Sequence, residues 1–380
     1  DIDAALAVAH AAGVPAQNFV VADAAGGIAW TVAGRLPKRV GFTGRYPVAW
    51  TYGDRYWDGF LNPGEIPVIR FAADGSATAG DGAIPGLIWS ANHRHIGGTG
   101  LEALGDGGYV GAARARQIRD RLVALEQARP ADLLAIQLDD EARQLVRWQR
   151  LLLQTLSPEV TAARPARAQL RTLAENWEGR AAVDSVSYRL VREFRRQVAA
   201  LALDPVFAPC IAWDETFNWR RFRYEEPLWI LVTERPAHLL DSKYTHWDDL
   251  LVAAADAVMA GLEKQGETPA RATWGRANLV RIRHPLSPMF PAWLTGWLDL
   301  PAQPLPGGDD LPRIQSRAFG ASQRMVVSPG REAEGIAHMP GGQSGHPLSP
   351  YYRAGHEAWA RGEPTPFLPG PPVHKLTLTP

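Results

Sequence analysis

The sequence has a single cysteine, Cys210, among 380 residues. One cysteine cannot form an internal disulfide, so no disulfide framework is available to hold the fold. The residues around Cys210 are apolar and include no histidine, which favours a buried, inert thiol over a cysteine nucleophile. Long apolar runs are also lacking, and none reaches the roughly 18 residues that span a bilayer, so no membrane partner is expected.

The sequence also has no net charge. The 40 lysines and arginines balance 40 aspartates and glutamates. General nucleic-acid binders carry a basic excess, so no nucleic-acid partner is predicted. The apolar share of 46% and the charged share of 21% are ordinary for a globular protein, and the chain is long enough to bury a substantial core.

Strand and helix patterns divide the chain into sheet-like ends and a helical middle. Residues 3–13 have the pattern of an amphipathic helix, and the apolar runs at 19–22 and 28–33 flank a tight turn, as in a hairpin. Further strands are expected at residues 68–72 and 87–89. The later expected elements are helices at residues 134–152, 186–198, 247–262 and 350–361 and strands at residues 324–327 and 336–338.

This order predicts an α+β fold in which the two ends share a sheet and the middle is a helical excursion. We expect three segments. Residues 1–110 form a sheet segment with loops, residues 111–270 are mainly helical, and residues 271–380 return to the core.

Common catalytic signatures are missing. The glycines around Ser344 do not have the spacing of a nucleophile elbow, and neither a His-Glu-x-x-His motif nor a phosphate-binding loop occurs. His93 and His95 could hold a metal from one face of a strand, but no third ligand has a recognisable spacing. The acidic run 139–141 predicts a solvated helix face, and the arginines at 192, 195 and 196 predict surface charge rather than a phosphate site.

Five stretches of sequence carry a resemblance. They are Asn18–Ala29, Gly34–Arg39, Gly86–Asn92, Gly320–Val327 and Gly341–Tyr352. In this order and spacing they resemble the penicillin acylase family of N-terminal-nucleophile amide hydrolases. The match runs along the whole chain but covers only the later part of the family's catalytic chain. The resemblance implies part of a sandwich in which helices enclose two antiparallel sheets.

The resemblance also implies two catalytic residues. Asn92 matches the side-chain donor of the family's oxyanion hole, whereas its sequence context alone favours a turn cap. Arg114 stands 22 positions later, at the start of a basic helix, where the family has a catalytically important arginine. A fixed positive charge there would lower the amine pKa of an N-terminal nucleophile. The alternative for Arg114 is an ordinary arginine on a helix face.

The attacking residue is the main departure from the family. In these enzymes a Ser, Thr or Cys at the chain start attacks and its own amine serves as base, which Asp1 cannot do. We therefore expect a C-terminal fragment of an amidohydrolase of linear amides, inactive alone. Its partner would be the missing N-terminal part, or α chain, of the same precursor, and its substrate a small acyl-amide. The alternatives are a non-catalytic binding module derived from the acylase fold and, less fittingly, a helical scaffold protein.

The expectations about a bound metal and about cellular location rest on the family resemblance alone. The family's calcium site takes several ligands from segments that this sequence does not include, and neither Glu102 nor Asp106 aligns cleanly with a later ligand. No cofactor is therefore assigned, and calcium is expected only in the complete enzyme. A periplasmic or other extracytoplasmic location is likewise implied, while the acyl group is left open.

Overall fold

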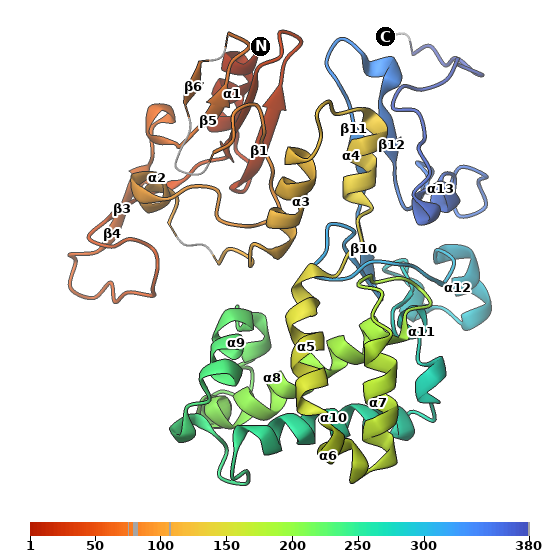
Figure 1. Cartoon of the computed structure of the whole chain (residues 1–380). Helices are drawn as coiled ribbons and strands as arrows, with labels where there is room; N and C mark the ends of the chain where they lie inside the picture. Colours follow the sequence, from red (N-terminus) through yellow and green to blue (C-terminus); the bar gives the residue numbers. More distant parts are fainter. Residues whose placement is uncertain (75, 79–82, 106–107, 379–380) are drawn as a thin grey trace. The chain divides into compact units, whose positions relative to one another are not determined.

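The computed structural model describes residues 1–74, 76–78, 83–105 and 108–378 (Figure 1). The α-helices are α1 (Ile2–Ala11), α2 (Gly98–Leu104), α3 (Ala113–Val123), α4 (Pro130–Gln137), α5 (Val146–Thr155), α6 (Pro158–Ala162), α7 (Pro165–Glu175), α8 (Val186–Trp213), α9 (Glu225–Glu234), α10 (Trp247–Lys264), α11 (Trp274–Ala277), α12 (Ala292–Leu298) and α13 (His356–Arg361). The strands are β1 (Gln17–Ala22), β2 (Ile28–Ala33), β3 (Pro37–Val40), β4 (Tyr56–Phe60), β5 (Ile69–Phe71), β6 (Ala77–Thr78), β7 (Leu279–Val280), β8 (Gln303–Pro304), β9 (Gln315–Ser316), β10 (Phe319–Gly320), β11 (Arg324–Val326) and β12 (Ile336–His338).

The chain forms two compact units, each built from separate stretches of sequence. The first unit comprises residues 1–134, 324–338 and 364–380, and the second unit comprises residues 135–323 and 339–363. The three-segment division along the sequence stays a prediction. The mixture of helices and small antiparallel sheets confirms the α+β class.

The first unit is organised around a sheet of β1, β2, β5 and β6, in that order, with antiparallel pairing. The expected hairpin is confirmed. Its turn is closed because Asp23 Oδ1 accepts a hydrogen bond from the Gly27 backbone N–H at 3.0 Å. Helix α1 contributes Ile2 and Leu6 to a buried cluster with Ala29 of β2, so the amphipathic pattern of this helix covers the strand.

One expected strand and the expected shared sheet are wrong for this unit, although the strands expected at 324–327 and 336–338 form as β11 and β12. Residues 87–89 do not form a strand, and Leu87 joins Ile84 only in an isolated bridge. In the described parts of the chain, β11 and β12 pair with each other rather than with the four-stranded sheet, so the two ends do not share a sheet. The pattern also missed the β3–β4 hairpin, whose exposed aromatic residues do not alternate with polar ones.

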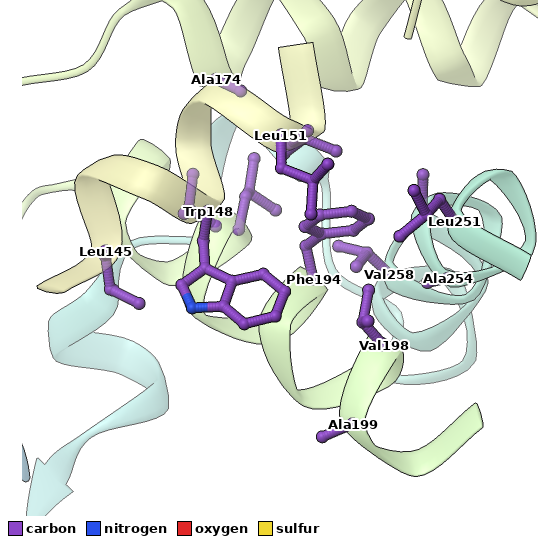
Figure 2. Close-up of a cluster of buried hydrophobic side chains, with 14 of the residues drawn as sticks. Leu145, Trp148, Leu151, Ala174, Phe194, Val198, Ala199, Leu251, Ala254 and Val258 are labelled. Atoms are coloured by element: carbon purple, nitrogen blue, oxygen red, sulfur yellow. The ribbon is translucent and has the colours of Figure 1, made fainter. Parts of the chain in front are cut away.

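The second unit has a helical core. Figure 2 shows Trp148 of α5 and Phe194 of α8 at its centre, with Leu251 of α10 among the side chains around them. All three are fully buried. Burying each such side chain stabilises the fold by about 2–3 kcal/mol. The apolar spacing in α8 and α10 therefore predicted both the helices and the faces that they bury.

The expected helix at 134–152 is interrupted, and this corrects the interpretation of the acidic run. It forms α4, a 3-10 turn and α5, and Asp139 and Asp140 lie buried at the break. The Asp139 carbonyl accepts from the Arg313 backbone N–H at 2.9 Å, and the Asp140 carboxylate pairs with Arg180. Periodicity cannot show such partners, because they come from distant parts of the sequence.

The arginines of α8 are a second correction. Only Arg196 is exposed as expected, with 58% of its side-chain surface accessible. Arg192 pairs with Asp309 and Arg195 pairs with Glu225, each at 2.6 Å, and the Arg195 side chain is only 12% exposed. The same helix carries Cys210 exposed rather than buried. Within the described residues, no helix is long and apolar enough to cross a membrane.

Candidate functional site

Asn92 occupies a strained position in the first unit. Its φ of +61° lies in the left-handed region, which asparagine tolerates better than most residues. The preceding Ala91 is buried, while the Asn92 side chain is exposed. The Asn92 carbonyl accepts from the Val110 backbone N–H at 2.8 Å. The backbone is thus anchored on both sides of a side chain that faces outward.

Arg114 lies directly against this asparagine. It is the second residue of α3 and is half-buried. Its Nη2 donates to Asn92 Oδ1 at 2.8 Å and to the Ala91 carbonyl at 3.3 Å. The two residues singled out from the sequence therefore share one hydrogen bond, although 22 positions separate them.

This contact fixes which way the amide faces. A guanidinium has donors and no acceptor, so the amide atom that meets Arg114 must be the oxygen. The Asn92 Nδ2 then points away from the arginine, and among the described residues it has no acceptor. A charged donor on the amide oxygen also polarises the amide and strengthens its N–H groups as donors. The arrangement suits a neutral group that donates to a developing negative charge.

A stack of aromatic rings follows Asn92 in the sequence. The His93 and His95 rings are 4.2 Å apart, and His95 stacks on Trp30 of β2 at 4.5 Å with an interplanar angle of 15°. Trp30 is itself held because its Nε1 donates to Asn18 Oδ1 at 3.0 Å. The stack connects the segment that bears Asn92 to the four-stranded sheet. Sequence reasoning missed it, although two histidines beside the asparagine were a visible signal.

The environment of both histidines favours their neutral form. Burial lowers the pKa of His93, and the charge of Arg114 lowers it further. Burial and the neighbouring His93 lower the pKa of His95 to about 4. The buried His93 Nδ1 and His95 Nε2 have no hydrogen-bond partner among the described residues. The rings therefore serve as packing groups at ordinary pH.

The metal-ligand candidates in the sequence are His93, His95, Glu102 and Asp106. The part of the chain that the structure describes holds no cluster of three or more His, Cys, Asp or Glu side chains suited to a metal ion. His93 and His95 lie in an irregular segment rather than on a strand. Glu102 is exposed on α2, and Asp106 lies outside the described residues. Calcium in a complete enzyme stays a prediction.

Comparison with known families decides the relationship. Residues 1–371 match the family described as penicillin amidase. The chain belongs to this family. The resemblance drawn from the five sequence stretches is thereby confirmed.

Two curated relatives support the penicillin amidase assignment. Penicillin acylase 2 proenzyme of Pseudomonas sp. (strain SE83) is 27% identical over 93% of this chain and 44% of its own length. The acyl-homoserine lactone acylase QuiP of Pseudomonas aeruginosa (strain PAO1) is 25% identical over 96% of this chain and 46% of its own length. The chain thus spans less than half of the length of either relative.

A solved penicillin acylase has the same fold. The thermostable penicillin G acylase from Alcaligenes faecalis matches with a TM-score of 0.54 at 16% identity, over 97% of this chain and 68% of that one. At this identity the likeness concerns the fold. It agrees with the mixed α+β architecture and its small antiparallel sheets.

Proposed function

We propose that this chain is the C-terminal part of an amidase that hydrolyses linear amides into an acyl group and an amine. Family membership supports amide chemistry, and both curated relatives are acylases by name. In this proposal Asn92 donates to the oxyanion of the tetrahedral intermediate, and Arg114 orients the Asn92 amide. The observation that carries the proposal is the 2.8 Å hydrogen bond from Arg114 Nη2 to Asn92 Oδ1, which turns the Asn92 N–H groups outward.

The physical reason is electrostatic. Attack on an amide places negative charge on its oxygen, and a fixed donor aimed at that charge typically contributes about 3–4 kcal/mol to the transition state. Asn92 needs little reorganisation, because its backbone is anchored and its amide oxygen is already bonded. Arg114 stays charged at every relevant pH, so the orientation of the amide does not depend on a titrating partner.

The nucleophile is proposed to come from elsewhere in a longer or two-chain protein. This is supported by the coverage of the relatives, of which the chain spans 44% and 46%. In the family's mechanism a Ser, Thr or Cys with its own free amine attacks the carbonyl. The chain by itself is then expected to bind or position a small acyl-amide without cleaving it. A periplasmic location is proposed from family resemblance alone.

Asn92→Gly in the longer protein tests the oxyanion role. Glycine adopts a φ of +61° freely, so this change removes the amide and keeps the backbone. With a chromogenic acyl-anilide, kcat should fall about 100- to 1000-fold with little change in KM. In Arg114→Ala, kcat should fall less, because the Asn92 donor is still present but is no longer oriented. Arg116→Ala is the matched control, since Arg116 is exposed on the same helix.

The outcomes separate the parts of the proposal. An Asn92→Gly protein with nearly full kcat would exclude the oxyanion role. Hydrolysis by the purified 380-residue chain, lost in Asn92→Gly, would retain that role and refute the external nucleophile. Specific binding of acyl-amides by the longer protein, with no hydrolysis at all, would favour the binding-module alternative.

A further inference from the structure

An arginine-rich cleft lies within the second unit. Its volume is about 1040 Å³, and its walls come from α8, α10, α11 and the turn between β9 and β10. Figure 1 labels α8, α10, α11 and β10 in the green-to-blue portion of the chain. Small-molecule sites commonly measure about 300–1,000 Å³, so this cleft is at the upper end of that range. It shares no residue with the Asn92 site.

The charge of the cleft contrasts with that of the chain. Its lining includes six arginines, namely Arg189, Arg192, Arg196, Arg220, Arg276 and Arg317. The acidic residues in the lining are Glu193, Glu267 and Asp309, and Asp204 outside the lining pairs with Arg220, so an excess of two positive charges remains. The whole sequence is neutral. A concave surface with an excess of one sign concentrates ligands of the opposite sign.

Four of these arginines are already paired. Arg189 pairs with Glu267 at 2.6 Å, and Arg192 pairs with Asp309 at the same distance. Arg196 and Arg220 also have carboxylate partners. These pairs form part of the cleft walls, and they neutralise the three acidic residues of the lining.

Arg276 and Arg317 are different. Both are exposed, and among the described residues neither has a carboxylate at ion-pair distance, although the charge of Arg276 helps to lower the pKa of Glu267. Arg276 is on α11, and the carbonyl of Arg317 accepts from the Arg281 backbone N–H at 2.6 Å, which anchors that turn. Two unpaired guanidiniums on anchored backbone thus open onto one cleft. Each offers the planar fork of donors that matches a carboxylate or a phosphate.

The remaining lining suggests an organic anion. Tyr224 is the aromatic residue of the lining that is partly exposed, whereas Trp219 and Trp274 lie buried behind Arg220 and Arg192. Asn278 also lines it, is 97% buried, and has an Nδ2 without an acceptor in the described parts of the chain. A buried donor left unpaired costs about 1–3 kcal/mol, which a small side-chain rotation toward a bound acceptor would recover.

We propose that this cleft is a second binding site, for a small organic molecule with two or more carboxylate or phosphate groups. Arg276 and Arg317 make the charge-assisted contacts, and the partly exposed Tyr224 contacts the body of the ligand. The proposal is independent of amide hydrolysis and of the Asn92 site. Carboxylate and phosphate are shared chemistry here, so the experiment uses a probe of each.

Isothermal titration calorimetry of the purified chain with citrate and with pyrophosphate tests this site. At least one probe should bind, and Arg276→Gln with Arg317→Gln should weaken it about tenfold to hundredfold for each lost charge-assisted contact. Arg271→Gln is the control, because Arg271 is an exposed arginine outside the cleft. Preferential binding of one probe would identify the anionic group.

Three results would overturn the proposal. The first is absence of binding by both probes at low salt, and the second is binding that the double variant leaves unchanged. The third is a loss of probe affinity in Arg271→Gln as large as that in the cleft variants. The last result would show that the anions follow overall charge and not a site. Because both substituted residues are exposed, circular dichroism should show unchanged helix content in every variant.

Discussion

Acid should destabilise the first unit through His95. Its pKa in the folded protein is about 4, against 6.5 for an ordinary histidine, because the ring is buried beside His93 and stacked on Trp30. For a base whose folded pKa is depressed, the contribution to stability is complete above the unfolded pKa. This contribution is lost as the pH falls from about 6.5 to about 4, and below pH 4 no further stability is lost through His95.

The size of the effect follows from the same shift. A fall of the pKa from 6.5 to about 4 corresponds to about 3 kcal/mol between the two protonation states. The ring is only partly buried, so water screens part of this, and we expect about 1–2 kcal/mol. That is a sizeable fraction of the stability of a typical domain.

The matched variant is His95→Phe, which keeps an aromatic ring on Trp30 and cannot be protonated. Urea unfolding of both proteins at pH 7, 5 and 4 should show the parent losing about 1–2 kcal/mol relative to the variant. NMR of labelled histidine should place the His95 titration well below that of a free imidazole. Equal losses in both proteins, or titration of His95 near pH 6.5, would refute the reasoning.

Three further stability predictions concern the second unit, each measured by urea unfolding. Phe194→Ala should cost about 3–5 kcal/mol because it opens a cavity in the core, whereas the exposed Phe319→Ala should change stability by less than about 0.5 kcal/mol. Glu225→Gln should cost about 3 kcal/mol at pH 7. Burial opposes ionisation of Glu225, but two arginines and hydrogen bonds hold its pKa below 4.5. The cost of Glu225→Gln should therefore shrink as the pH falls below 4.5. A cost that does not change with pH would contradict the ion-pair explanation. Gly342→Ala should destabilise the unit strongly, because its Cβ would lie 1.8 Å from a backbone carbonyl oxygen, whereas Gly345→Ala meets nothing within 4 Å.

The spacing of apolar residues along the sequence predicted those helices and strands whose burial depends on neighbouring positions. The hairpin of β1 and β2 and the helices α1, α8 and α10 follow from alternation or from the spacing of apolar residues, and all of them form. Their buried faces were also visible, as Phe194 in α8 shows. These features need no information about distant residues.

Features that depend on distant partners were missed. Asp140 is buried because Arg180 and the backbone of Ala181 meet it, and no local signal distinguishes it from a solvated acid. Arg195 is buried for the same reason, through Glu225. At the candidate site, the resemblance selected Asn92 and Arg114, but only the structure shows that the two share a hydrogen bond.

The nested arrangement of the two units has a consequence for biosynthesis. Residues 135–323 and 339–363 belong to the helical unit, while the unit that carries Asn92 also includes residues 364–378. As the polypeptide leaves the ribosome, the helical unit can therefore gather all of its own residues first. The first unit, by contrast, can complete its contacts among residues 1–134, 324–338 and 364–378 only after residues 364–378 have been translated.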